Sequence, residues 1–210
     1  MTERRKRGSL SPQHVVDAAI EVADDGGVDA LTIRAVAERV GASPMAIYRH
    51  VDDREDLLVR MLDRIAAEFP VAIDAPTPLE RISQRFLGQH DLLAPRPWVL
   101  HILVRGDLVP PNAFAAIDAN IGDLLELGFS GSDAITRLGM LWHFVLGELL
   151  DRHPHLVGPR PTQRERALLA MDVEQLPNYA HVLGGLDPGD GPMNCPIRST
   201  LPIVFAAICA

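Results

Sequence analysis

Apolar residues recur every three or four positions along about the first 70 residues, which is the period of helices that bury one face. Residues that favour helix ends interrupt this pattern. Ser11 precedes Pro12, where a serine side chain caps free amides and a proline lacks only an amide that would be unpaired. The glycine pair 26–27 ends the first helix, and Gly41 ends the second. The pattern predicts four helices, over residues 12–25, 32–40, 44–50 and 53–69.

The second and third of these helices form a unit. Both are short, and the turn between them has three to four residues and contains a glycine, as in a helix-turn-helix. The apolar stripe of the second helix braces the third, in which only Ile47 is expected to face inward. A helix this short is not stable without its neighbours. Its other face is therefore free to enter a groove.

Helical periodicity resumes after residues 70–78, a stretch with three prolines that is typical of a linker. Helix starts are expected near residues 78, 97 and 111, and Ser132 is expected to cap the longest helix, over 132–150. The sequence contains no convincing strand, repeat or low-complexity segment. The expected fold class is all-α.

Charge limits how the chain could bind nucleic acid. The formal net charge is −8, and residues 1–69 carry ten basic and thirteen acidic side chains. Indiscriminate binding to nucleic acid is therefore unfavourable. A DNA contact must depend on a few placed cations and on backbone amides. The basic segment 4–7 is either a solvated tail or a mobile arm that attracts phosphates.

The sequence also predicts a compartment. The longest apolar stretch, 201–210, is half the length of a membrane-spanning helix, and no continuous apolar segment of the signal-peptide kind follows the basic start. We expect a cytoplasmic protein with no membrane partner. Cys195 and Cys209 are too few for a disulfide framework and are expected to be inert thiols.

Residues 31–51 read LTIRAVAERVGASPMAIYRHV and resemble the DNA-binding motif of the tetracycline-repressor family. Members share a Leu-Thr pair, an Ala-x-x-x-Gly segment, a serine-capped recognition helix and a tyrosine near its end, in this order. Val51 stands where most members have phenylalanine. The resemblance covers about residues 11–69. It implies a transcriptional repressor that binds a palindromic operator in double-stranded DNA as a homodimer and is released by a small-molecule effector, with no cofactor.

The resemblance also implies a domain organisation. A three-helix helix-turn-helix DNA-binding domain with a connecting fourth helix would occupy residues 1–69, followed by a linker over 70–78. A helical domain for ligand binding and dimerisation would occupy 79–210.

The family's DNA contacts map onto the second to fourth predicted helices. Thr32 would cap its helix and touch a phosphate, and Arg34 would reach a base edge, where a guanidinium suits guanine. The first turn of the third helix would meet bases, while its end and the next helix would bind phosphates. The partner of Arg49, base or phosphate, stays open. The implied set is Thr32, Arg34, Ser43, Pro44, Met45, Ala46, Tyr48, Arg49, His50 and Arg54.

Simpler interpretations exist for three of these residues. Thr32 could be a helix cap only, Arg34 could pair with Glu38 four residues on, and Tyr48 could be a packing residue with a solvated hydroxyl.

The long predicted helix resembles the family's regulatory core through residues 127–130 and the Trp-x-x-x-x-Gly pattern at Trp142 and Gly147. In the family this helix contributes to dimer packing. It is apolar on more than one face, so we expect a partner subunit to cover the second side. Full burial within one subunit is the alternative. The family's second dimer helix has no clear counterpart, because 184–210 holds either a shortened, very apolar helix or an atypical tail.

The C-terminal core is expected to bind a moderately large, partly apolar effector with one or two polar anchors. The composition of the helices gives these candidates for the pocket: Phe86, Trp98, His101, Phe114, Trp142 and His143. For His101 and His143, a hydrogen-bonded core histidine is the alternative.

Two other function classes compete. A small helical metal-binding protein or enzyme would use the cluster His153-Pro154-His155, but this cluster lacks a carboxylate or cysteine at ligand spacing and is expected in a loop. The sequence has no nucleophile elbow, phosphate loop or zincin motif, so we do not expect an enzyme. The other class is a helical adaptor that does not bind DNA.

Overall fold

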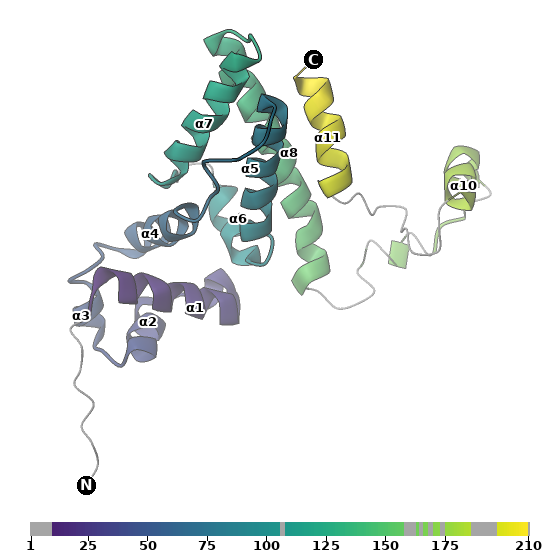
Figure 1. Ribbon diagram of the computed structural model, residues 1–210. Coiled ribbons are helices and arrows are strands. Elements are labelled where there is room, and N and C mark those ends of the chain that lie inside the picture. The colour runs from purple at the N-terminus through teal and green to yellow at the C-terminus, as the bar shows by residue number, and fades with distance from the viewer. Residues whose placement is uncertain are drawn as a thin grey trace.

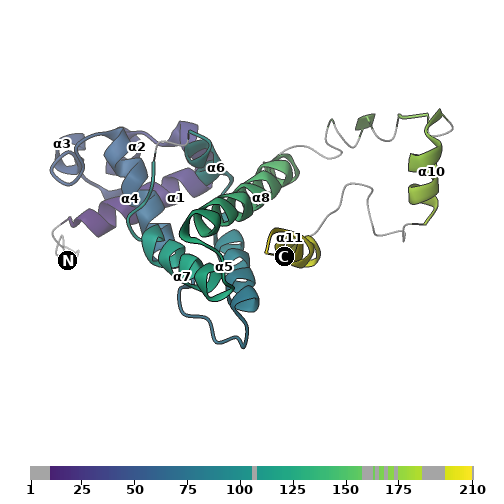
Figure 2. The same cartoon turned by 90° about the horizontal axis from the view of Figure 1, so that it is seen from above.

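Helices are the only regular secondary structure in the part of the chain that this computed structural model describes, so the expected all-α fold class is confirmed. Figures 1 and 2 show a small N-terminal unit joined to a larger bundle, with α10 (Pro177–Gly184) standing apart from both. The described residues are 10–105, 108–157, 163, 166–167, 170–172, 175–185 and 197–209. The N-terminal unit comprises α1 (Pro12–Ala30), α2 (Ile33–Val40) and α3 (Pro44–Ile47), and α4 (Arg54–Ala66) connects it to the bundle of α5 (Pro78–Leu93), α6 (Pro97–Leu103), α7 (Ala113–Glu126), α8 (Gly131–Val157) and α11 (Ile197–Ile208).

Local signals start and stop the helices of the N-terminal unit. The side chains of Ser11, Thr32 and Asp53 each accept a hydrogen bond from the backbone amide three residues on. Gly27, with φ of 76°, interrupts α1, and Gly41, with φ of 66°, ends α2. Both positions need a positive φ, which costs glycine least. The predicted starts of α1, α2 and α4 and the two glycine breaks are therefore confirmed.

Packing holds the short helices together. α1 packs on α2 and α4, and α2 packs on α3. Ile47, the inward residue predicted for α3, is fully buried. Arg39 of α2 binds Asp25 at 2.6 Å and Glu21 at 3.0 Å, both on α1. The hydrogen bonds to Asp25 and then Glu21 raise the pKa of Arg39 above its ordinary value.

Several predicted helix ends were wrong. α3 ends at Ile47 rather than near residue 50, and α4 ends at Ala66 rather than at 69. Ser130, not Ser132, accepts the hydrogen bond from the amide of Asp133 and caps α8. The segment 153–155, expected in a loop, lies inside α8, which continues to Val157. The one amide donor that a proline removes does not stop this helix.

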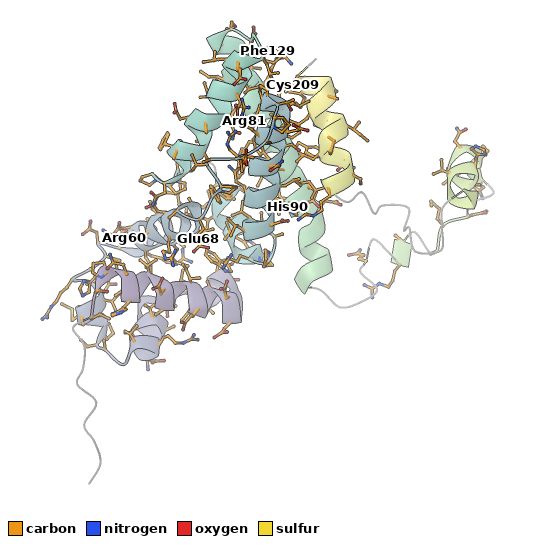
Figure 3. The ribbon with its side chains drawn as sticks, in the orientation of Figure 1. Arg60, Glu68, Arg81, His90, Phe129 and Cys209 are labelled. Atoms are coloured by element: carbon orange, nitrogen blue, oxygen red, sulfur yellow. The ribbon has the colours of Figure 1, made fainter. Side chains whose placement is uncertain are left out.

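Helix α5 lies between α7, α8 and α11 (Figure 2) and begins with a capping box formed by Thr77 and Glu80. Its contact with α7 contains buried charges. The Arg85 guanidinium donates to Asp123 at 2.6 Å, to Asn120 Oδ1 at 3.0 Å and to the backbone oxygen of Val71 at 2.7 Å. Arg81, one turn earlier and labelled in Figure 3, also binds Asp123. The network ties α5 to α7 and to the segment that follows α4.

Helix α11 decides, for part of residues 184–210, between an apolar helix and an atypical tail. Its buried residues Ile197, Leu201 and Phe205 face α5 and α8, and the ring of Phe205 lies 5.8 Å from that of Phe86. His90 of α5, labelled in Figure 3, places Nε2 2.6 Å from Glu148 of α8, and Arg198 donates to the adjacent Asp91. Of the two alternatives, the short and very apolar helix is correct for 197–208.

The described helices include none with the length and hydropathy that crossing a bilayer requires. At the C-terminal end, desolvation raises the pKa of the Cys209 thiol, and a weaker effect of Arg137 opposes it. Cys195 and the basic segment 4–7 lie outside the described residues.

Candidate functional site

Helix α3 presents most of its side chains to solvent. Ile47 is its one buried residue, whereas Met45 is 71% exposed and Tyr48 is 50% exposed. Ser43 and Pro44, at the N-terminus of α3, are exposed as well. This face is held from behind and open in front, the arrangement that lets a helix enter a groove.

Arg49, directly after Tyr48, has no ion pair or hydrogen bond within the described residues. Every other arginine of the segment 10–69 is engaged within the chain. Arg34 pairs with Glu38 at 3.0 Å, with both side chains well exposed. Arg54 donates to the backbone oxygens of Val28 at 3.2 Å and Leu31 at 3.4 Å, where α1 ends. Among the described arginines of this segment, Arg49 is therefore the one whose guanidinium can bind an anion without first breaking an interaction within the chain.

Carboxylates surround the start of α4. Asp53 caps the helix, and Asp56 accepts hydrogen bonds from Arg60 and from the backbone amide of Asp52. Partial burial acts to raise the pKa of Asp56, but these hydrogen bonds outweigh it and hold the pKa below its ordinary value. Asp56 is therefore ionised at neutral pH. The negative charge here disfavours non-specific binding to the phosphate backbone of DNA. Binding to DNA must therefore depend on individual side chains and backbone amides at defined positions.

The bundle contains a cavity of about 380 Å³. Its walls come from α4, α5, α7 and α8, from the end of α6 and from residues 108–110. Val109 and Ile135 line it and are both more than half exposed, which places its mouth between 108–110 and the start of α8. Apolar side chains dominate the walls, and the described lining residues include no charged side chain. Its size lies within the range of about 300–1,000 Å³ typical of ligand pockets.

Three polar groups line this cavity: the side chains of Gln89, Asn120 and Trp142. Gln89 is only 5% exposed, yet it has no hydrogen-bond partner within the described part of the chain. Buried amides are nearly always hydrogen-bonded, so one that faces a cavity without a partner is a candidate to bind a ligand.

Helix α4 connects the cavity to the N-terminal unit. Leu62 and Ile65 of α4 form part of the wall. Between them in sequence, Asp63 accepts hydrogen bonds from the Asn112 backbone amide at 2.6 Å and from its Nδ2 at 2.8 Å. Asn112 lies two residues after the segment 108–110 at the cavity mouth and directly precedes α7. A change in the cavity wall can therefore displace a helix that leads to α3.

A stripe of exposed residues follows one face of α8. Positions spaced four and three residues apart lie on the same side of a helix. This α8 stripe consists of Thr136, Met140, His143, Gly147 and Leu150, all of them exposed. The two large apolar members, Met140 and Leu150, are 48% and 42% exposed.

Comparison with known proteins agrees with this geometry. Residues 15–61 match the sequence profile of the family described as "Bacterial regulatory proteins, tetR family". An HTH-type transcriptional regulator of Saccharopolyspora erythraea is 26% identical over 194 residues, which is 90% of this chain and 80% of the relative. The chain belongs to the tetracycline-repressor family of transcriptional regulators.

Other members resemble this regulator over much of its length. The Escherichia coli tetracycline repressor protein class D is 27% identical over 154 residues, which is 70% of this chain and 68% of that protein. The Streptomyces coelicolor TetR family protein ActR, solved in complex with actinorhodin, has a TM-score of 0.76 at 21% identity and covers 96% of this chain and 97% of its own. At 21% identity, the likeness to ActR shows a shared fold. The family is one of regulators rather than enzymes.

The ten residues that the resemblance assigned to DNA are all at least partly exposed in this regulator. Thr32 and Arg34 belong to the start of α2, the segment 43–50 contains α3 and the turn after it, and Arg54 begins α4. Two of the simpler interpretations are part of the structure, since Thr32 is a cap and Arg34 does pair with Glu38. Ser43 has no capping hydrogen bond from its side chain, contrary to the family pattern.

The structure places the expected pocket residues in different parts of the molecule. Phe86 and Trp142 line the cavity of this regulator, but Trp98, His101, Phe114 and His143 do not. Trp98 is buried at the junction of α6 and α1, where its indole donates to Asp24 at 2.5 Å. His101 and Phe114 are exposed, and His143 belongs to the α8 stripe.

The sequence analysis missed the two amides of the cavity, although a signal was available. Gln89 lies three residues after Phe86 and Asn120 three after Ile117, so each places an amide on the apolar face of its helix. Among the described residues no cluster of three metal-ligating side chains occurs. The side chains of 153–155 lie outside those that the structure describes.

Proposed function

We propose that this regulator is a repressor that binds a palindromic operator as a homodimer and leaves it when a small molecule fills the cavity of the bundle. The exposed face of α3 carries this proposal. Met45 of α3 and, in the turn directly after it, Tyr48 and Arg49 are exposed around the buried anchor Ile47, and the Arg49 guanidinium has no partner among the described residues. Apolar groups that suit thymine methyls and a free cation for phosphate are the two requirements of a reading helix.

The role of each residue follows from its place on this surface. The first turn of α3, with Pro44, Met45 and Ala46, reads bases in the major groove, and Arg34 reaches a base edge from α2. Thr32, Ser43, Tyr48, Arg49, His50 and Arg54 bind phosphates. The family resemblance and the exposure of these residues support this assignment. Such a protein acts in the cytoplasm, where the bacterial chromosome lies.

The dimer would form through the α8 stripe. Two recognition helices fit successive major grooves only when they are about 34–36 Å apart, so the interface must hold the two N-terminal units at a fixed separation. The alternation of four and three residues in the stripe is the spacing by which two helices pack along a common seam. In this organisation residues 1–69 form the DNA-binding unit, 70–78 the linker and 79–210 the ligand-binding and dimerisation unit.

Release would act through α4. Leu62 and Ile65 belong to α4, so a ligand that fits the cavity only when they are in one position favours one position of α4. Because α4 leads to α3, this also favours one separation of the two recognition helices in the dimer. Linkage then requires that operator DNA weakens ligand binding by the same factor.

Selection from a random DNA pool tests the proposal. The full-length protein should enrich a palindrome whose half-site centres are about 10 base pairs, or a multiple of that, apart. A double variant, Met45→Ala with Arg49→Ala, should enrich nothing and yet give an unchanged circular dichroism spectrum, because both side chains are exposed. An enriched site without two-fold symmetry would contradict the dimer, and no enrichment at any salt concentration would contradict the function.

A further inference from the structure

The cavity recognises polar atoms with very few groups. Gln89, Asn120 and Trp142 are the only described lining residues whose side chains carry hydrogen-bonding groups. The remaining lining residues are aliphatic, aromatic, proline or glycine. A ligand that fills this space is therefore sorted mainly by its apolar surface, and its polar atoms must meet these three side chains.

The orientation of Asn120 can be derived. The Arg85 guanidinium lies 3.0 Å from the Asn120 amide, and a guanidinium only donates hydrogen bonds. The atom that faces Arg85 must therefore be the carbonyl oxygen Oδ1. This leaves Nδ2, a donor, without a partner among the described residues, in a side chain that is 1% exposed and borders the cavity.

The side chains of Trp142 and Gln89 add further hydrogen-bond donors. The indole Nε1 of Trp142 is a donor only, and it has no partner in the described part of the structure. Gln89 can donate or accept and is likewise unpartnered. The residues that line the cavity thus carry at least two donors, Asn120 Nδ2 and Trp142 Nε1, that no acceptor of the described chain occupies. A charge placed here would lose its hydration and meet no opposite charge, which is a large cost.

We propose that the cavity selects uncharged, mostly apolar molecules that present a hydrogen-bond acceptor oxygen, such as an aromatic ketone, to the Gln89, Asn120 and Trp142 donors. This rests on the proposed function in taking the cavity as the effector site. Anions and cations are disfavoured because the described wall offers no opposite charge to replace their hydration.

Three naphthalene probes of nearly equal size separate the requirements. The first is 6-propionyl-2-(dimethylamino)naphthalene, an uncharged ketone, and the second is its 6-propyl analogue, which lacks the acceptor. The third is 6-(dimethylamino)-2-naphthylacetate, an anion with as many non-hydrogen atoms as the ketone. Titration of the full-length protein by calorimetry should show the ketone binding about three- to tenfold more tightly than the propyl analogue, the value of one neutral hydrogen bond. The anion should bind at least about tenfold more weakly than the ketone.

Three variants test whether the probes bind in this cavity. Gln89→Met keeps the length of the side chain but removes its hydrogen bonds, so the advantage of the ketone over the propyl analogue should shrink. Gly139→Leu should abolish binding of both, because Gly139 lines the cavity and a Cβ there meets no neighbouring atom. Gly122→Leu is the matched control. Gly122 is also helical, exposed and free of neighbours at Cβ, but it lies away from the cavity, so binding should be unchanged.

Three results would overturn the proposal: no binding of the ketone, equal binding of the anion, or normal ketone binding by Gly139→Leu. Operator affinity, measured in the same samples, tests the proposed function separately. If the ketone binds as expected but never weakens operator binding, the ligand class holds and release by a ketone of this type fails. If no DNA is bound with or without the probe, the proposed function fails while the probe titrations still decide the ligand class.

Discussion

The three arginines assigned to DNA differ in what their guanidinium groups already bind. Arg49 has no partner among the described residues. The Arg34–Glu38 pair is 83% and 68% exposed, and an exposed pair of this spacing contributes only about 0.3–0.5 kcal/mol, so a base can displace Glu38 at little cost. Arg54 satisfies two backbone oxygens at the end of α1. Replacing Arg54 should therefore lower stability as well as DNA affinity, and it is a poor test of phosphate binding.

Arg49→Ala is the sharper test. Arg49 follows α3 rather than lying in its first turn, so we expect it to bind a phosphate. The variant should lose affinity for operator and random DNA by the same factor, and the slope of log affinity against log salt should become shallower by about 1. Fluorescence anisotropy over a range of salt concentrations measures both. A loss confined to the operator would make Arg49 a base contact instead.

Arg34 should behave in the opposite way. Arg34→Ala should cost about 1–3 kcal/mol on the operator and relax the preference at one base pair, with little effect on random DNA. Glu38→Gln should tighten binding because it frees Arg34, and it should gain less when Arg34 is already alanine. Competition with operators substituted at single base pairs measures these changes. Equal losses on operator and random DNA would mean that Arg34 binds a phosphate.

At the scale of elements, the sequence predicted helix starts better than helix ends. A start depends on one capping side chain within three residues, as at Thr32 or Thr77, so it is legible locally. Ends depend on tertiary packing, which is why α3 and α4 were predicted too long and α8 too short. Periodicity predicted that a helix face is buried, but it could not separate a cavity wall from solid core. The cavity therefore had to come from the structure.

The connection between α4 and α7 gives a prediction at this scale. Asp63→Ala removes the carboxylate that accepts from both Asn112 donors at the start of α7 and leaves Nδ2 only its longer bond, 3.3 Å, to the Asp63 backbone oxygen, so we expect a loss of about 1–3 kcal/mol in unfolding free energy. Amide hydrogen exchange should quicken in 108–113 and in the second half of α4. Glu55→Ala is a control, since the Glu55–Arg105 pair also joins α4 to the bundle but lies at the first turn of α4. Unchanged exchange in 108–113 would show that Asp63 does not hold this segment.

At the scale of the whole molecule, α8 serves three surfaces. Leu141 and Val145 are fully buried in the core, Leu138 and Trp142 line the cavity, and the α8 stripe faces solvent. A partner subunit on the stripe would leave only one helix between the dimer seam and the ligand. A change in either could then reach the other without a long chain of contacts. This short connection between ligand and dimer interface exists only if the α8 stripe is the interface. A test of the interface is therefore also a test of the connection.

Gly147→Lys tests the seam with little risk to the fold. Leu146 packs against the core, so a charge there would disturb the subunit itself, whereas Gly147 is exposed and a Cβ added to it meets no atom within 4 Å. Removing a glycine from a helix interior should stabilise the isolated subunit by up to about 1 kcal/mol. If two α8 stripes pack together, however, the lysine places a charge in their interface. We expect a monomer by sedimentation at micromolar concentration and loss of operator binding, because one subunit holds only one half-site. Gly122→Lys makes the same change on α7, also in open space, and should remain a dimer. A Gly147→Lys protein that sediments as a dimer and binds operator normally would show that the two subunits meet elsewhere.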